Sequence, residues 1–263
     1  MGKIIAIVNQ KGGVGKTTTT VNLGACLATL DKKVLIIDAD PQANASSGLG
    51  LDISELNNTI YECMLDGANP KDGVQNTSLE CLKILPSHID LVGAEIELLQ
   101  VEERESVLKK VLAGIEDDYD FILIDCSPSL GMVTVNALTA ADSVLIPVQA
   151  EYFALEGIAK LVNTMQIVKK KLNPSLSIEG FLITMYDPRA RLGRQVIEEI
   201  TRYFGEMTFQ TVINRNVKLA EAPSFGQSII EYDIESKGAQ NYMQFTQEFL
   251  ARNASKTYSG ELK

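Results

Sequence analysis

A short apolar segment that runs directly into a glycine-rich loop constrains the fold of this chain more than any other feature. Residues 3–9 read KIIAIVN, a β-branched run that is typical of a strand buried on both faces. Residues 10–18 follow as QKGGVGKTT, and residues 17–30 carry leucines at helical spacing. Backbone N–H groups in such a loop can turn toward an anion, and the N-terminus of the next helix adds partial positive charge. The strand, loop and helix together predict a phosphate-binding site.

The individual loop residues indicate a nucleoside triphosphate with a metal ion. Lys16 can reach the β- and γ-phosphates, and the Thr17 hydroxyl can coordinate Mg²⁺. The strict pattern GxxxxGK[ST] is missed at one position, because Gln10 stands where the first glycine would be. We predict that the nucleotide is bound by Lys11, Gly12, Gly13, Val14, Gly15, Lys16, Thr17 and Thr18.

Four more apolar segments repeat the strand-like pattern, at residues 34–38, 121–125, 143–149 and 178–185. Helical stretches lie between them, and residues 155–172 carry apolar side chains at every third or fourth position. Alternating apolar strands and amphipathic helices predict right-handed crossovers. We therefore expect an α/β protein with a mainly parallel twisted sheet and helices on both faces, the P-loop NTPase fold.

The chain shows no internal repeat and no long linker, so we expect a single P-loop ATPase domain over residues 1–252. Residues 52–93 are the least regular part, because Asn, Gly and Pro residues that form turns are frequent there. Residues 253–263 are polar, and we expect them to form a flexible tail.

Two of the apolar segments end in an aspartate, as a Mg²⁺-dependent phosphoryl-transfer site requires. Residues 34–38 end in Asp38, with Asp40 two positions later, and residues 121–125 end in Asp125. Ligands of open α/β sheets bind at the carboxyl ends of the strands, and an acid placed there can hold Mg²⁺. We predict a metal site formed by Thr17, Asp38 and Asp125, with the aspartates acting through water.

Composition excludes several classes of protein. His88 is the only histidine, which argues against a histidine triad or a multi-histidine metal site, and the four cysteines form no CxxC pair. No stretch approaches the roughly 18 apolar residues that span a bilayer. The first residues run straight into the first strand-like segment, so no cleaved signal peptide is expected. We expect a cytoplasmic protein.

The balance of charge restricts where nucleic acid could bind. The formal net charge is −10, so the molecule as a whole should repel nucleic acid at long range. Residues 189–218 differ, because they carry six basic side chains against three acidic ones. A local patch in this stretch is the one candidate for contact with phosphates, and a solvated helix face is the alternative interpretation.

The loop KGGVGKT resembles the deviant Walker A motif of the ParA/MinD group of P-loop ATPases, because Lys11 adds a second lysine ahead of Lys16. The resemblance implies that Lys11 reaches across a homodimer to the phosphates bound by the other subunit, so that ATP holds the dimer together. Residues 38–44, DADPQAN, are similar to switch I of the group, and residues 126–131, CSPSLG, to switch II. The resemblance assigns Asp40 to orienting the attacking water, and Lys11, Lys16 and Asp40 to catalysis.

Longer segments look like the chromosomal ParA/Soj branch of this group, at residues 93–98, 136–157, 184–200 and 214–229. The chain departs from the pattern of the branch at two positions that commonly hold proline, where it has Ser127 and Asn214.

The resemblance to this branch implies further site residues. Asn214 and Asn216 would contact adenine, with the contact of Asn214 left open by its departure from the pattern. Arg189 and Lys218 would bind DNA without sequence preference, and Arg215 belongs to the same basic stretch. Counterion release from phosphates would make such binding sensitive to salt.

We therefore expect a partition ATPase. Its ATP-bound dimer would bind DNA and associate with the nucleoid, and hydrolysis stimulated by a ParB-type centromere-binding partner would release it. Two alternatives remain at this point: a MinD-like ATPase that binds membranes, and a P-loop amide ligase that activates a small substrate. The sequence leaves three points open: whether the protein serves a chromosome or a plasmid, which protein is its partner, and whether its output is segregation or control of replication initiation.

Overall fold

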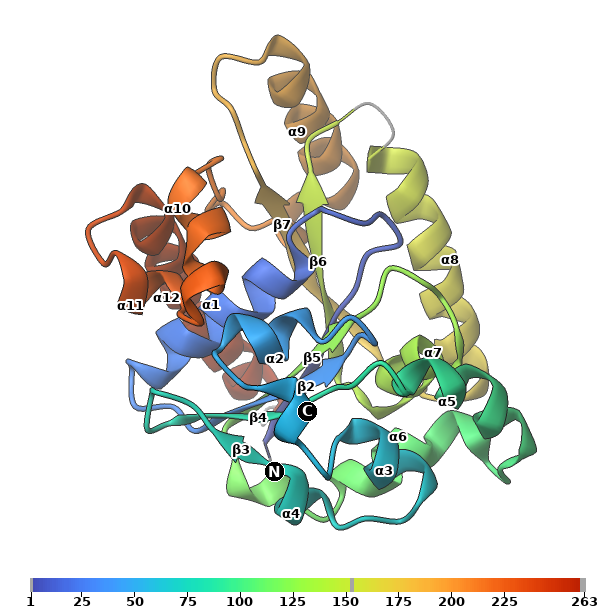
Figure 1. The fold of residues 1–263 in the computed structure, drawn as a ribbon. Helices are drawn as coiled ribbons and strands as arrows, with labels where there is room; N and C mark the ends of the chain where they lie inside the picture. The colour runs from blue at the N-terminus through green and yellow to red at the C-terminus, as the bar shows by residue number, and fades with distance from the viewer. Residues whose placement is uncertain (1, 152–153, 261–263) are drawn as a thin grey trace.

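The computed structural model describes residues 2–151 and 154–260, and a seven-stranded sheet runs through its centre (Figure 1). The strand order is β3-β4-β2-β5-β1-β6-β7, and every neighbouring pair is parallel except β3 with β4. This confirms the expected α/β fold. The strands are β1 (Lys3–Ile7), β2 (Val34–Ala39), β3 (Gln75–Asn76), β4 (Leu82–Leu85), β5 (Phe121–Cys126), β6 (Ser143–Gln149) and β7 (Ser177–Thr184).

Helices cover both faces of the sheet, as the alternation of patterns predicted (Figure 1). The α-helices are α1 (Lys16–Ala28), α2 (Asn44–Gly48), α3 (Ile60–Leu65), α4 (Pro70–Gly73), α5 (Leu91–Glu97), α6 (Val107–Leu112), α7 (Met132–Ala140), α8 (Ala154–Lys171), α9 (Arg191–Phe204), α10 (Val217–Glu221), α11 (Ile229–Tyr232) and α12 (Lys237–Gly260). Short 3₁₀ turns are η1 (Ile53–Glu55), η2 (Leu98–Gln100), η3 (Arg104–Ser106), η4 (Glu116–Asp118), η5 (Gly205–Met207) and η6 (Ala222–Phe225).

The sheet separates two apolar cores, because successive side chains of a strand point to opposite faces. Ile4 and Ala6 of β1 belong to the core formed with α3 and with α5 to α9, whereas Ile5 and Ile7 belong to the core formed with α1, α11 and α12. Strands buried on both faces read as continuous apolar runs, which explains why the sequence of β1 does not alternate.

Two strands lie where the sequence indicated only irregular structure. β4 reads LKIL and pairs in parallel with β2 over Val34–Ile37, and β3 adds two residues at its outer edge. The polar Lys83 interrupts an apolar run of only four residues, so the pattern is too short to stand out among the surrounding turns.

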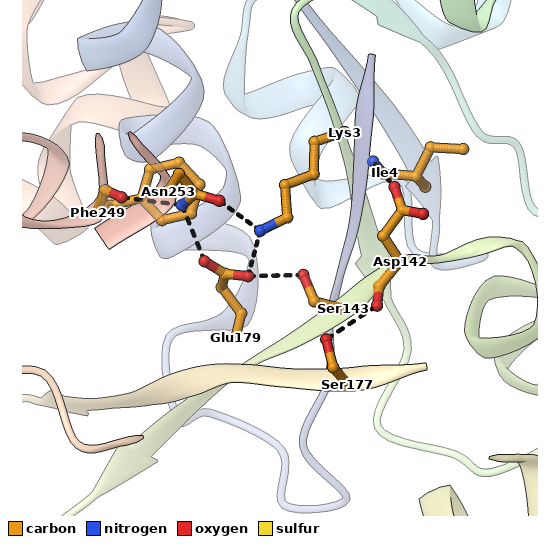
Figure 2. A network of polar contacts seen from close by, with 8 residues as sticks. All are labelled: Lys3, Ile4, Asp142, Ser143, Ser177, Glu179, Phe249 and Asn253. Carbon is orange, nitrogen blue, oxygen red and sulfur yellow. Dashed lines mark hydrogen bonds and ion pairs between the residues drawn. The ribbon is translucent and has the colours of Figure 1, made fainter. Parts of the chain in front are cut away.

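The end of the chain is more regular than expected. Asn253 donates through Nδ2 to Oε1 of Glu179 (2.9 Å) and accepts from Nζ of Lys3, which also donates to Oε2 of Glu179 (2.6 Å; Figure 2). Helix α12 continues to Gly260, so the segment that we expected to begin a flexible tail at residue 253 begins as helix. Residues 261–263 of that segment lie outside the described residues.

Candidate active site

The glycine-rich loop joins β1 to α1 and opens toward the carboxyl edge of the sheet. Gly13 (φ 74°) and Gly15 (φ 86°) adopt the left-handed conformation, which is strained for residues with a β-carbon. A β-carbon added to Gly12 or Gly13 would meet no atom within 4 Å, so the loop borders open space. Loop N–H groups and the N-terminus of α1 can surround a phosphate there.

Contacts from distant strands hold this loop. Thr184, at the end of β7, donates its hydroxyl to the carbonyl of Val14 (2.8 Å). Asn9 donates through its amide to the carbonyl of Pro147 in β6 (2.8 Å) and accepts from the backbone N–H of Lys11 (3.0 Å). The loop is therefore fixed between β1, β6 and β7, and little rearrangement is needed when an anion binds.

The two loop lysines lie in different environments. Lys16 is buried, and its ammonium lies 3.5 Å from the carbonyl of Lys11, inside the curve of the loop. Burial lowers the pKa of Lys16, and the charges of Asp125, Cys126 and Asp40 act in the opposite direction. Lys11 is half-exposed and forms an ion pair with Glu151, just beyond β6. The buried lysine can neutralise phosphate within its own subunit, whereas the exposed one would have to leave Glu151 to bind another anion.

The predicted acids meet at one point of the sheet, because Asp38 of β2 and Asp125 of β5 are partners in the parallel register. Oδ1 of Asp125 accepts from the Thr20 hydroxyl (2.9 Å), and the Thr17 and Thr20 hydroxyls both act to lower the pKa of this carboxylate. Burial raises the pKa of Asp125 and of Asp38, and the nearby charge of Asp38 raises that of Asp125 further. A cation at this point would stabilise both ionised forms.

The carboxylate of Asp125 fits a Mg²⁺ site. Its Oδ2 is buried and has no hydrogen-bond partner among the described residues, so a water bound to Mg²⁺ could donate to it. Within residues 2–151 and 154–260, no three His, Cys, Asp or Glu side chains gather around a possible metal position. Mg²⁺ commonly retains waters and takes phosphate oxygens as ligands, so Thr17 and Asp125 would suffice as the protein's contribution.

Asp38 has a structural role in this conformation. Its Oδ2 accepts from the backbone N–H (2.9 Å) and the hydroxyl (2.7 Å) of Ser46, in α2. Its Oδ1 accepts from the N–H of Asp40 at 3.3 Å. Asp38 thus fixes the segment between β2 and α2, and its contact with the metal through water stays a prediction.

Asp40 begins a tight and strained turn. Its Oδ1 accepts from the N–H of Gln42 (3.0 Å), and its carbonyl accepts from the N–H of Ala43 (2.9 Å). Ala43 is left-handed at φ 50°, a conformation that costs about 1 kcal/mol or more outside glycine. The turn that holds Asp40 is therefore fixed by two local hydrogen bonds and contains one strained residue, Ala43.

The segment after β5 is held from the side by another helix. Glu95 of α5 accepts from the backbone N–H groups of Met132 and Val133, at the start of α7. Ser127 hydrogen-bonds to Ser129 (2.9 Å between hydroxyl oxygens), so the serine that replaces proline supports the turn locally.

Cys126 is buried, and burial raises the pKa of its thiol, which keeps it protonated and unreactive.

The two asparagines predicted to lie near adenine are both engaged by the protein. Asn214 donates its backbone N–H (3.1 Å) and its side-chain amide (2.9 Å) to Oδ1 of Asn241 in α12. A proline at position 214 could not donate the first of these bonds. Asn216 caps α10 by accepting from the N–H of Lys218 (2.8 Å). Contact of either residue with adenine stays a prediction.

The predicted DNA-binding residues are exposed, and two of them form local ion pairs. Arg189 binds Asp187 with both ends of its guanidinium, at 3.0 and 2.9 Å. Arg215 lies near enough to help lower the pKa of Asp187. Lys218 pairs with Glu221 at 3.2 Å. Binding of DNA by these side chains would require them to exchange carboxylates for phosphates.

Several residues that build the site were not singled out by the sequence. All of them except Asn9, which directly precedes the loop, support the nucleotide loop and switch segments from elements far away in the chain. Their types are common in any surface loop, so the local sequence gives no signal for them. They are Asn9, Glu95, Glu151, Thr184 and Asn241.

Comparison with known proteins places this site in a family. Residues 2–178 match a family model described as an AAA domain. The chain is 54% identical over 251 residues to the sporulation initiation inhibitor protein Soj of Bacillus subtilis, covering 95% of this chain and 99% of that protein. It is 48% identical over 257 residues to the chromosome partitioning protein ParA of Myxococcus xanthus, covering 98% and 91% of the two chains.

Among solved structures, cobyrinic acid a,c-diamide synthase of Mycobacterium smegmatis with bound ATP analogue and magnesium superimposes with a TM-score of 0.86. It is 35% identical, and the match covers 97% of each chain. The nucleotide and cofactor that the sequence predicted, ATP and Mg²⁺, are thus those of a close structural relative. On identity over nearly its full length, the chain belongs to the ParA/Soj family of Mg²⁺-dependent partition ATPases.

Proposed function

We propose that this chain is the ATP-driven switch of a DNA partitioning system. ATP binding at residues 11–18 joins two copies into a dimer, the dimer binds DNA non-specifically, and hydrolysis stimulated by a ParB-type partner releases it. The protein would then be nucleoid-associated only when ATP is bound. One observation carries this proposal. Lys16 is buried and can bind the phosphates in its own subunit, whereas Lys11 of the same loop is exposed and can bind the phosphates of a second copy.

Electrostatics explain why ATP would control association. The chain has a net charge of −10, so two copies repel each other unless an attractive interaction between them offsets this charge. Lys11 gains a triphosphate partner only when the second copy brings one, and its bond to Glu151 is then exchanged for bonds to phosphate. ADP lacks the γ-phosphate and offers less charge, so it should support a weaker dimer.

Different residues of the chain would perform different parts of the hydrolysis reaction. Lys16 and the loop N–H groups neutralise the phosphates, and Thr17 with Asp125 would hold Mg²⁺, which supplies charge neutralisation when bound. Asp40 would orient the attacking water. Phosphoryl transfer depends mainly on positioning and charge, so a site without a strong base is suited to slow turnover that a partner can accelerate.

The experiment that tests the proposal is size-exclusion chromatography with light scattering, in ATP, ADP and no nucleotide, for the wild type and Lys11→Ala. We expect the wild type to dimerise in ATP but not in ADP or without nucleotide. The variant should stay monomeric in all three conditions while still binding ATP. Lys170→Ala, on the exposed face of α8, is the control. Normal ATP-dependent dimerisation of Lys11→Ala would overturn the proposed switch.

A second experiment addresses the DNA surface. Charge reversal at Arg189 and Lys218 should abolish DNA co-sedimentation with ATP while leaving dimerisation intact. The matched control is charge reversal at Lys169 and Lys170 of α8. If the first double variant still binds DNA as the wild type does, the patch lies elsewhere.

The MinD-like alternative requires an apolar helix face that is available to lipid. Tyr242, Phe245 and Phe249 of α12 are instead buried in the core with α1. In the part of the chain that the structure describes, none of the helices has the length and apolar character needed to cross a bilayer. Flotation with anionic liposomes, run beside DNA co-sedimentation, separates the two interpretations.

A further inference from the structure

One helix has an apolar face toward solvent as well as toward the core. Leu91, Ala94 and Leu98 bury one side of α5 and η2. Large apolar side chains on the other side are exposed at intervals of three, four and three residues, which places them on one face. We name this face the α5 stripe, formed by Ile89, Val92, Ile96 and Leu99.

The α5 stripe is continuous, because the helical turn begins before α5 itself. The N–H of Val92 donates to the carbonyl of Ile89 (3.0 Å), and η2 extends the helix to Gln100. Scattered exposed apolar residues need no explanation, but a row of them on one helix face is typical of a surface that another molecule covers.

The surroundings of the α5 stripe are acidic. Residues 88–105 contain six carboxylates and one arginine, Arg104. Asp90, Glu97 and Glu102 are exposed, and they stand close in sequence to the residues of the stripe. A symmetrical contact between two copies would bring these acids against each other, and an anionic lipid surface would be repelled by them. The charge therefore favours a partner segment with basic residues beside its apolar ones.

Helix α5 is connected directly to the active site. It packs against α7 and α3 (Figure 1), and its Glu95 binds the N–H groups that open α7, immediately after residues 126–131. A β-carbon added to Gly131 would collide with the Glu95 carboxylate, so the two segments are in close contact. Glu95 therefore joins α5 directly to the segment that follows Asp125.

We propose that the α5 stripe is the docking surface for an amphipathic, basic segment of the partner that stimulates ATP hydrolysis. The proposal rests on the proposed function for the existence of that partner. Docking covers the four apolar side chains, the acidic rim pairs with the partner's basic residues, and Glu95 carries the effect to the switch segment at residues 126–131.

The test uses the full chain and the purified cognate ParB-type protein. The variant is Ile96→Asp with Leu99→Asp, and the control is Ile234→Asp with Ile167→Asp. The two pairs are matched, since Ile96 and Ile234 are both 70% exposed, and Leu99 and Ile167 are 47% and 51% exposed. Readouts are partner affinity by interferometry, ATPase rate with and without partner, and ATP-dependent dimerisation.

We expect the stripe variant to bind the partner at least about tenfold more weakly, as loss of central apolar contacts typically does. Its unstimulated ATPase rate and dimerisation should match the wild type, and the control should be normal throughout. Glu95→Gln should keep the affinity for the partner but lower the maximal ATPase rate that the partner stimulates. A purely structural role of Glu95 would not change one of these quantities without the other. Ile96→Ser with Leu99→Ser repeats the test if the aspartate pair folds poorly.

Each other outcome contradicts the proposal in a distinguishable way. Full stimulation of the stripe variant overturns the docking surface and leaves the proposed function standing. Loss of ATP-dependent dimerisation in that variant means that a second copy of the chain covers the stripe. A wild type that no ParB-type protein stimulates removes the partner step of the proposed function, and the docking surface with it.

Discussion

At the scale of single residues, the nucleotide site combines groups that are fixed with groups that are available. Lys16 and Asp125 are buried and held, which suits binding of the phosphates and the metal. Lys11, Arg189 and Lys218 are exposed, and each forms an ion pair with one carboxylate. Exposed ion pairs contribute roughly 0–1 kcal/mol, so a multiply charged ligand can displace them.

Substitution of Asp40 separates nucleotide binding from turnover. Asp40→Ala removes the carboxylate that would orient water but none of the groups that hold phosphate. We expect the ATPase rate to fall by about 100-fold, with ATP binding retained and the dimer trapped on DNA. Single-turnover kinetics and co-sedimentation measure both. Turnover at the wild-type rate would remove the assigned role.

Asp187 should restrain DNA binding. Hydrogen bonds from Arg189 lower the pKa of Asp187 to about 2, so the carboxylate stays ionised, and the ion pair is lost only as the pH falls toward that value. Asp187→Asn frees Arg189 and removes a negative charge, and DNA affinity should rise about two- to fivefold near neutral pH. Fluorescence anisotropy measures the change, with exposed Asp66→Asn as control. Unchanged or weaker binding contradicts the restraint.

At the scale of elements, the final helix connects opposite ends of the sheet. Near its start, Asn241 of α12 accepts a hydrogen bond from Asn214, and Tyr242 contacts Thr19 of α1 (3.1 Å). At the other end, Asn253 joins Lys3 and Glu179 (Figure 2). The helix therefore fixes the segment around Asn214 relative to β1 and β7.

The ion pair at the base of the sheet should matter for stability. Lys3→Met removes the ammonium that pairs with the buried carboxylate of Glu179, whereas the hydrogen bonds from Ser143 (2.8 Å) and Asn253 remain. We expect a loss of about 2 kcal/mol in the free energy of unfolding, less than for a fully buried pair because Lys3 is partly exposed. Urea denaturation measures it, with Lys170→Met as control. A loss below that of the control would show that the pair contributes nothing.

At the scale of the whole molecule, an acidic protein is expected to bind DNA through one small basic region. Two such regions joined in a dimer gain affinity without any new type of contact. The net charge of −10 opposes binding everywhere else, so the number of phosphate contacts should decide the affinity.

Salt dependence therefore reports the state of assembly. Each phosphate contact contributes about −0.9 to the slope of log affinity against log salt concentration. We expect a slope about twice as steep with ATP as with ADP, because the dimer doubles the number of contacts. Binding measured at several salt concentrations in both nucleotides gives the two slopes. Equal slopes would mean that a single copy makes all the contacts.

Much of the fold and of the site was predictable from local sequence. The loop at residues 10–18, the apolar strands and the aspartates that end β2 and β5 are consecutive in the chain, and their geometry follows from strand and helix periodicity. β3 and β4 were missed because strands of two and four residues carry too little pattern. The tail from residue 253 was expected to be irregular because its polar sequence gives no sign of Asn253's partners.

Sequence by itself determined which residue types stand at the expected site: the glycines and two lysines of the loop at residues 10–18, and the aspartates that end the second and fifth strands. Tertiary structure alone decided how that chemistry is held and connected. Thr184 reaches Val14, Glu151 reaches Lys11, and Glu95 reaches the start of α7, across separations in the chain that no local pattern records. Those contacts depend on the order of strands and the faces that helices cover, and these are fixed only when the whole core is packed.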